Sequence, residues 1–368
     1  MTRKLLFLSG LAIVGVVLNH AAGWGYVAMF WWADRYAPVV APNFGAMGSP
    51  AYFALRGIEQ LITASVPAFL FVSGFFVAFA SGRQSRPAWG WAWTRIYWLV
   101  IPYLIWSVLT LGGDAALGQT YSAGEYLRRL LVGGATPAFY FVPLLCQLYL
   151  LSPWIVPLAR DHGRALLIGT AILQVFLHAA RYAILLNVDL PGREAWSFLL
   201  SSWFFPGNLL WFAWGTITGF HFEKVKLMLV RARWLWLIGA ALLLPVGVLE
   251  WETILRASGQ QWIGSTDTLL DTVFSLLCLL AFLGFEVSRV PGYRALSDLG
   301  GRAFGVYVAH SVVLTYLSKV IYHAAPWALA SQVLYQPLLI AAGLGLPLVL
   351  MALVRNSPAR RAYGYLFG

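Results

Sequence analysis

The chain has very little charge for its length. Of its 368 residues, only 11% are Asp, Glu, Lys or Arg, whereas soluble domains carry roughly one quarter. A packed soluble domain needs a charged shell, so this shortage excludes a soluble globular fold. In its place the chain has 60% hydrophobic residues, among them 18 Trp, 23 Phe and 17 Tyr. This composition predicts a protein that crosses a membrane several times.

Several functional classes are excluded by motifs that are missing. The two cysteines, Cys146 and Cys278, lie in apolar segments, which excludes a disulfide framework and a CxxC metal site. The six histidines show no HExxH spacing, and no phosphate loop, GxGxxG or GxSxG motif occurs. We therefore expect no bound metal or cofactor. No basic run is present either, so the net charge of +11 indicates membrane topology and not affinity for nucleic acid.

Apolar runs long enough to cross a bilayer recur along the chain. A hydrocarbon core of about 30 Å needs about 20 apolar residues per helix. The first run follows Met-Thr-Arg-Lys without a small-residue cleavage site, which favours a retained span over a signal peptide. The sequence predicts an all-α bundle of ten spans, at about Leu5 to Ala22, Ile58 to Ala80, Arg95 to Leu111, Ala138 to Ala159, Ala165 to Leu186, Leu199 to Phe222, Trp234 to Leu249, Thr268 to Val287, Ala303 to Tyr322 and Val333 to Val354.

The positions of Lys and Arg predict the orientation of these spans. If the N-terminus is cytoplasmic, 17 of the 25 Lys and Arg residues fall in inner segments, as the positive-inside rule requires. With ten spans, both termini are then cytoplasmic. The outer connections Gly23 to Gly57 and Gly112 to Pro137 are the longer ones and are expected to form an extracytoplasmic roof. No soluble domain, linker or internal repeat is evident, so residues 1–368 are predicted to form one membrane domain.

Ionisable groups inside spans are costly, and each is a candidate functional residue. His20, next to Asn19, lies at the outer end of the first span, where it could act as a general base or simply pack between helices. Glu59 stands three residues after Arg56 on one helix face. Glu59 could orient His20, as in base-plus-orienter pairs, or only form an ion pair with Arg56.

Two further histidines lie within predicted spans. His310 falls near mid-membrane in the ninth span, where a buried imidazole needs a partner. It could be catalytic, line an acyl channel, or bond a neighbouring helix. His178 and Arg181 are i, i+3 on the fifth span and could form a polar stripe, although structural packing accounts for them as well.

Four ordered segments carry a family pattern. They are Gly10-Leu11-Ala12-Ile13 through Asn19-His20; Val66-Pro67-Ala68-Phe69-Leu70-Phe71-Val72-Ser73-Gly74-Phe75; Arg95-Ile96 and Pro102-Tyr103, followed by Tyr140-Phe141-Val142-Pro143 through Tyr149-Leu150-Leu151-Ser152-Pro153; and Gly305-Val306-Tyr307 with His310. In this order, over about Leu5 to Val354, they resemble the acyltransferase-3 family. Members of that family are integral membrane enzymes of about ten spans that modify glycans and other extracytoplasmic acceptors. The second segment is similar to the VPxFFxxSGF sequence of one branch.

The resemblance implies a site and exposes one departure. The family's essential histidine corresponds to His20, but the arginine that the family commonly has eleven residues earlier is Ser9 here. Positive charge for the phosphates of a coenzyme A donor would then come from Arg83, Arg86 or Arg95, or from Lys4 at the inner rim. Otherwise this member uses a different donor or has lost activity.

The first functional hypothesis is an O-acyltransferase. By resemblance, it would move an acyl group, acetyl in the first instance, from cytoplasmic acyl-CoA to a hydroxyl of an extracytoplasmic glycan or lipid-linked sugar, in a bacterial inner membrane. His20 would deprotonate the acceptor or relay the acyl group. Candidate hydrogen-bond donors to the oxyanion are Asn19, Ser73, Tyr307 and His310, and the aromatic residues that would stack on the sugar are Trp24, Tyr26, Trp31 and Trp32.

Two alternatives stay open at this point. A transporter of a lipid-linked or glycan intermediate would use the same polar residues to line a path. Prolines inside the predicted spans, such as Pro67, Pro102 and Pro245, fit the discontinuous helices of transporters. The other alternative is a catalytically inactive relative, which the missing arginine makes credible.

Overall fold

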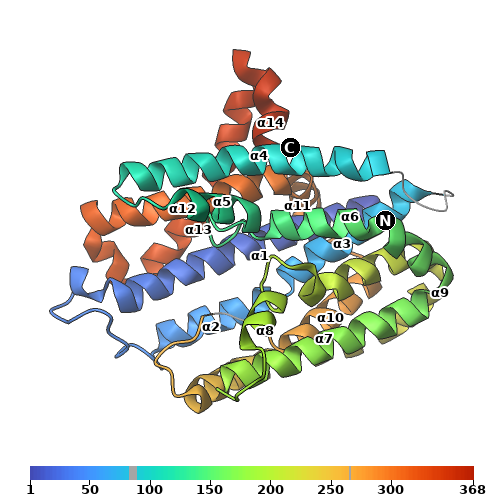
Figure 1. Ribbon diagram of the computed structural model, residues 1–368, viewed down its shortest axis with the longest axis horizontal. Helices are drawn as coiled ribbons and strands as arrows, with labels where there is room; N and C mark the ends of the chain where they lie inside the picture. The colour runs from blue at the N-terminus through green and yellow to red at the C-terminus, as the bar shows by residue number, and fades with distance from the viewer. Residues whose placement is uncertain (83–88, 265–266) are drawn as a thin grey trace. The chain divides into compact units, whose positions relative to one another are not determined.

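A computed structural model describes residues 1–82, 89–264 and 267–368, and within these ranges the regular structure is entirely helical (Figure 1). The α-helices are α1 (Thr2–Tyr26), α2 (Pro50–Ile62), α3 (Ser65–Ser81), α4 (Trp89–Ala116), α5 (Ala123–Val132), α6 (Phe141–Asp161), α7 (Gly163–Leu185), α8 (Arg193–Leu199), α9 (Leu209–Ser258), α10 (Leu269–Gly284), α11 (Tyr293–Gly300), α12 (Ala303–Ala324), α13 (Gln332–Arg355) and α14 (Tyr363–Phe367).

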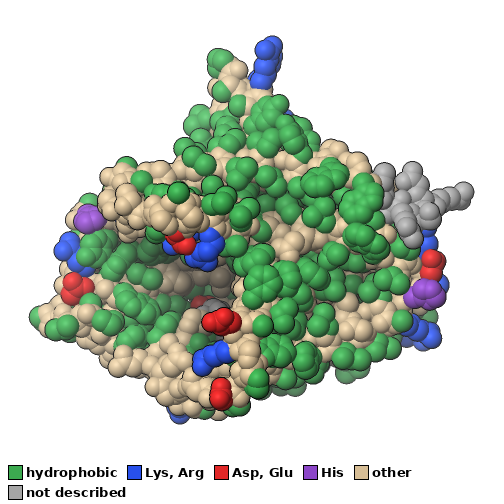
Figure 2. All heavy atoms as spheres, in the orientation of Figure 1, with side chains coloured by type: hydrophobic (Ala, Val, Ile, Leu, Met, Phe, Trp, Pro, Cys, Tyr) green, Lys and Arg blue, Asp and Glu red, His purple; other side chains and the backbone are tan. Residues whose placement is uncertain are grey.

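Within the described residues, eight helical segments are long and apolar enough to cross a membrane. They comprise α1, α2 together with α3, α4, α6, α7, α9, α12 and α13, and α10 is a shorter apolar helix. Hydrophobic side chains cover most of the face shown in Figure 2, as a surface in contact with lipid requires. The protein is therefore an integral membrane protein.

The count of eight differs from the ten predicted spans in two places. The predicted span Thr268 to Val287 is the shorter helix α10, with 16 residues, and two further predicted spans are joined in α9. The segments Leu199 to Phe222 and Trp234 to Leu249 were expected as separate helices, but residues 209–258 are helical throughout. The charged stretch between them, residues 223–233, contains neither glycine nor proline and is built mostly of good helix formers such as Leu, Lys, Arg and Met. Helical propensity therefore carries the helix through a segment that its charge marks as a loop.

The packing of α9 shows that it is not straight. Gly163, at the start of α7, lies against Ile217, and Tyr182, near the end of α7, is hydrogen-bonded to Glu250. At 1.5 Å per residue, the α7 segment between these points is about 29 Å long and the α9 segment about 50 Å. The helix α9 bends between the two contacts, so it retains two apolar halves on either side of the charged stretch.

The helices form two compact units. The first comprises Met1–Ala12, Thr63–Tyr97 and Phe141–Gly300. In it α3 and α10 pack along α9, with backbones so close that a Cβ atom at Gly215 would overlap the carbonyl oxygen of Phe71. Only glycine permits this approach of two helices, which is a common device in membrane bundles.

The second unit comprises Ile13–Ile62, Trp98–Tyr140 and Gly301–Gly368. Its core brings α1, α12 and α13 together around fully buried residues that include Ala21, Leu314 and Tyr335. The Tyr335 hydroxyl donates to Ser318 Oγ at 2.8 Å, so the polar end of this ring is satisfied inside the core. Beyond Tyr26, α1 widens into a π-helix at Val27–Trp31.

The connection between α4 and α6 contributes to the same unit. The helix α5 has no buried residue. On its exposed surface, hydrogen bonds from the Arg128 side chain hold the pKa of Glu125 below its usual value. The loop that follows turns inward, and Phe139 in it is fully buried between the rings of Tyr103 and Tyr307. The predicted roof thus contains a segment that packs into the helices.

Candidate active site

Two histidines from distant parts of the sequence meet in the second unit. The helix α1 carries His20 and α12 carries His310, and their ring centroids are 5.3 Å apart with the planes inclined at 45°. His310 is completely buried, whereas His20 is partly exposed. The structure therefore brings together the two histidines that the sequence singled out separately.

The hydrogen bonds of His310 fix its tautomer. Its Nδ1 lies 2.6 Å from the carbonyl oxygen of Tyr307. A carbonyl only accepts, so Nδ1 carries the hydrogen and, in the neutral ring, Nε2 presents a lone pair. That Nε2 is buried and has no hydrogen-bond partner in the described part of the chain. An unsatisfied buried acceptor costs about 1–3 kcal/mol, which marks this position as a candidate functional site.

Tyr307 connects His310 to the inward-turning loop. Its hydroxyl donates to the carbonyl oxygen of Ala138, while its own carbonyl accepts from His310. The loop, Tyr307 and His310 thus form one chain of hydrogen bonds. Because the Tyr307 hydroxyl already has an acceptor, its expected role as an oxyanion donor would require that bond to open.

The ring of His20 makes no hydrogen bond to the described part of the chain. Its neighbour Asn19 is partly exposed, and its side-chain amide likewise has no hydrogen bond among the described residues. A neutral imidazole in this state can accept a proton from a hydroxyl. Asn19 remains a candidate donor to an oxyanion.

Glu59, expected to orient His20, is engaged by other groups. Its carboxylate accepts from Arg56 Nη1 at 2.7 Å and from the Tyr26 hydroxyl at 3.2 Å. The Arg56 guanidinium also lies over the rings of Tyr26 and Tyr52. This cluster joins the end of α1 to α2, so it holds the segment that follows His20.

The four aromatic residues expected to bind the acceptor divide into separate groups. Trp24 and Trp32 contact each other, with ring centroids 5.3 Å apart, and Trp32 also packs on Tyr322. Trp31 packs edge-on against Phe44 and is 38% exposed. Tyr26 is only 3% exposed, which leaves the three tryptophans as surfaces for a sugar.

Two glutamines that the sequence analysis missed hold α1 next to His20. On α13, the buried Gln336 donates through Nε2 to the carbonyl of Ala21 at 3.1 Å, and Gln332 donates to the carbonyl of Gly25 at 3.3 Å. A Cβ atom at Gly25 would overlap Gln336 Nε2. The available signal was a pair of amides four residues apart in an apolar span, opposite a glycine in α1.

A pocket of about 420 Å³ lies in the first unit. Its polar groups come from Ser73 on α3, Arg95 and Trp91 on α4, and Tyr149 on α6, and apolar side chains of α3 complete the lining. The Arg95 guanidinium lies 5.6 Å from the Trp91 ring centroid, and Trp91 packs edge-on against Tyr149. The Arg95 guanidinium in a mostly apolar pocket suits an anionic ligand with an apolar arm. The sequence had indicated Arg95 and Ser73, but not Trp91 or Tyr149.

A comparison with protein families identifies the family of the chain. A family model described as an acyltransferase domain matches residues 7–352. The chain belongs to the acyltransferase-3 family. No significant match is found among curated proteins or among solved structures. Membership makes the chain a membrane acyltransferase.

The departure of this acyltransferase-3 protein at Ser9 is built into its packing. Ser9 is buried, and at the adjacent Gly10 a Cβ atom would overlap the carbonyl oxygen of Leu296 on α11. Lys4 does not replace the arginine, since its ammonium donates to the carbonyls of Leu283 and Phe285 at the end of α10. Arg83 and Arg86 lie outside the described residues, so Arg95 is the expected donor-binding cation that the structure places in a pocket.

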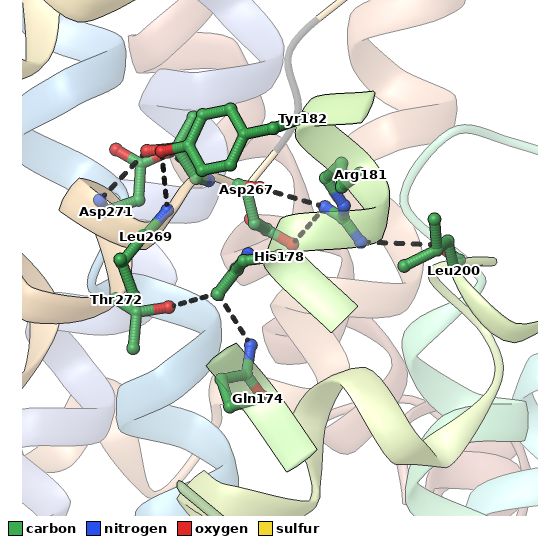
Figure 3. A network of polar contacts seen from close by, with 10 residues as sticks. Gln174, His178, Arg181, Tyr182, Leu200, Asp267, Leu269, Asp271 and Thr272 are labelled. Carbon is green, nitrogen blue, oxygen red and sulfur yellow. Dashed lines mark hydrogen bonds and ion pairs between the residues drawn. The ribbon is translucent and has the colours of Figure 1, made fainter. Parts of the chain in front are cut away.

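His178 and Arg181 of this acyltransferase-3 protein belong to a different polar network (Figure 3). His178 Nε2 lies 2.7 Å from Thr272 Oγ1 and 2.9 Å from Gln174 Nε2. Arg181 donates to the Asp267 carboxylate and to the Leu200 carbonyl. Tyr182 in the same network bonds Glu250. The network ties α7 to α9 and α10, which agrees with the structural interpretation of this stripe.

Proposed function

We propose that the protein transfers an acyl group from cytoplasmic acyl-CoA to a hydroxyl of an extracytoplasmic glycan or lipid-linked sugar. In this proposal the acyl group is acetyl and the membrane is a bacterial inner membrane. The observation that carries this proposal is the contact between His20 and His310, with the tautomer of His310 fixed. Family membership supplies the reaction class, and the residues supply the roles.

His20 is the general base in this proposal. Its imidazole takes the proton of the acceptor hydroxyl as the oxygen attacks the thioester carbonyl. A new ester bond forms, the carbon–sulfur bond breaks, and the departing thiolate takes up the proton to give free coenzyme A. His310 is the neighbouring acceptor in this proposal: its Nε2 lone pair, which has no partner in the described part of the chain, would favour the charged, protonated form of His20 and orient its ring.

The donor is assigned to the pocket that contains Arg95. An arginine forms paired hydrogen bonds with phosphate oxygens, and the apolar wall of α3 suits the arm that carries the thioester. Ser73 and Tyr149 supply hydroxyls near that arm. This assignment provides a cation for the phosphates in a protein whose position 9 is serine.

Most of the candidate helix breaks lie inside continuous helices, which weakens the transporter alternative. Pro102, Pro153 and Pro245 lie inside α4, α6 and α9, and Pro67 lies in the first turn of α3, where proline is tolerated. Pro206 differs, because it lies in the short 3-10 helix Phe205–Asn208 that precedes α9. Discontinuous helices were the main sequence argument for transport.

The test is release of free thiol from acetyl-CoA by purified protein in the presence of envelope polysaccharide. We expect the variant His20→Ala to lose about 10³-fold in rate, while His323→Ala, an exposed histidine of α12, keeps the wild-type rate. A His20→Ala protein that is folded and fully active would refute the assignment of the base.

A further inference from the structure

Gly23 in α1 has no packing reason to be glycine. A Cβ atom built there meets no atom within 4 Å, and its backbone is helical without a positive φ. Glycine is less favourable than alanine inside a helix. At Gly25, two residues later, a Cβ atom would overlap Gln336 Nε2, so packing requires glycine there but not at Gly23. Other glycines, such as Gly345, also have open space around the Cβ position, and what sets Gly23 apart is its place three residues after His20 on α1.

The empty space lies on the same face of α1 as His20. Residues three and four apart are neighbours on a helix surface, so His20, Gly23 and Val27 follow one another along one side. All three are partly exposed. Val27 begins the π-helix that ends at Trp31, a feature frequent at functional sites, and Trp31 is among the exposed large side chains. We call His20, Gly23, Val27 and Trp31 the acceptor strip.

The opposite side of α1 is closed. Ala21 and Ala28 are fully buried in the apolar core with Leu314 and Tyr335, and Gln336 fills the space beside Gly25. A ligand that reaches His20 from the Trp31 end of α1 can therefore follow the acceptor strip, but not the core side. Trp31 lies eleven residues after His20 along helical backbone, a path of about 16 Å.

We infer that Gly23 is a specificity-determining position that leaves room for the acceptor chain, and that this acceptor is an uncharged, extended glycan. The inference rests on the proposed function. The acceptor strip carries no Asp, Glu, Lys or Arg. Just beyond Trp31, Arg35 donates to the Tyr322 carbonyl and lies over the Tyr322 ring, and the exposed Asp34 would repel a phosphate or carboxylate of the acceptor. Trp31 offers a ring on which a sugar can stack, and a path of this length fits a glycan chain better than a compact alcohol.

The experiment is a size series at Gly23, namely Gly23→Ala, Gly23→Val and Gly23→Leu, with Gly345→Leu as the matched control. Gly345 lies in α13 of the same unit and likewise has open space around its Cβ position. Transfer from labelled acetyl-CoA is measured to two acceptors, envelope polysaccharide and methanol. Melting temperatures are recorded for every variant.

We expect transfer to polysaccharide to fall with side-chain size, by about tenfold or more for Gly23→Leu, while transfer to methanol stays within about twofold of wild type. Gly345→Leu should keep both rates, and Gly23→Ala should melt no lower than wild type.

Two results would overturn the inference while leaving the proposed function in place. One is equal transfer to polysaccharide by Gly23→Leu and wild type. The other is an equal loss with both acceptors by folded Gly23→Leu protein, which would indicate damage to His20 itself. Wild-type protein that transfers to neither acceptor would overturn the proposed function and this inference with it.

Discussion

The chain of hydrogen bonds that ends at His310 gives the site its order at the scale of single residues. The loop carbonyl of Ala138 accepts from Tyr307, whose carbonyl accepts from His310. Each bond fixes the next group, so the ring of His310 is held with its centroid 5.3 Å from that of His20. A base that must become charged during the reaction is stabilised by a neighbouring acceptor.

This chain predicts graded effects in two variants. His310→Gln should lower kcat by about 10²-fold without changing KM for acetyl-CoA, because the donor is assigned elsewhere. Tyr307→Phe removes only the bond to Ala138 and should lower kcat less. Initial rates of thiol release measure both, and a His310→Gln protein with wild-type kcat would contradict a role for His310 beside His20.

Substitutions of Arg95 test whether acetyl-CoA binds in the pocket of the first unit. Loss of a charge-assisted hydrogen bond costs about 1.5–3 kcal/mol, so Arg95→Ala should weaken acetyl-CoA binding by at least about tenfold. The affinity of Arg95→Lys for acetyl-CoA should lie between those of wild type and Arg95→Ala, since lysine keeps the charge but loses the paired hydrogen bonds. Calorimetry measures the affinity. Arg294, exposed on α11, provides the control in Arg294→Ala, and equal binding by all variants would remove the donor from this pocket.

The sequence predicted the candidate site residues better than it predicted which residues they contact. His20 and His310 are conspicuous because ionisable groups are rare in apolar spans. Their contact depends on how α1 and α12 pack, which no local pattern encodes. Gln336 and Tyr149 were missed for a related reason, since each acts only through a neighbour far away in sequence.

Close helix contacts dominate at the scale of elements. The pair α3 and α9 meets at Gly74 and Gly215, where a Cβ atom would overlap a carbonyl oxygen of the facing helix. We expect Gly215→Ala to destabilise the protein by about 1–3 kcal/mol, seen as a lower melting temperature in detergent. Gly169→Ala on α7, where the Cβ position is open, should be neutral or stabilising by up to about 1 kcal/mol. Equal melting of the two variants would contradict the close packing.

Length and apolar composition predicted helices in all ten apolar runs, and each run contains an α-helix in the structure. The division into elements was less well predicted. Charge at residues 223–233 indicated a loop, yet helix formers fill that stretch and α9 continues through it. Charge reports where a chain leaves the membrane, whereas propensity decides whether the backbone stays helical.

For the whole molecule, the sequence predicts on which side of the membrane the two termini lie. The excess of Lys and Arg in alternate connections predicts that both termini are cytoplasmic, and the two apolar halves of the bent α9, together with α10, allow ten crossings. A green fluorescent protein fused after Gly368 should therefore fluoresce, and alkaline phosphatase fused there should be inactive. Fusions after Gln119, in the predicted outer connection, should behave in the opposite way. Active phosphatase at Gly368 would contradict the topology.

Acyl transfer across the membrane should depend on His20. Proteoliposomes with labelled acetyl-CoA on the side of the termini and envelope polysaccharide on the other side allow wild-type protein and His20→Gln to be compared. We expect ester-linked label on the polysaccharide with wild type and none above background with the variant. Label transferred equally by the folded His20→Gln protein would contradict it.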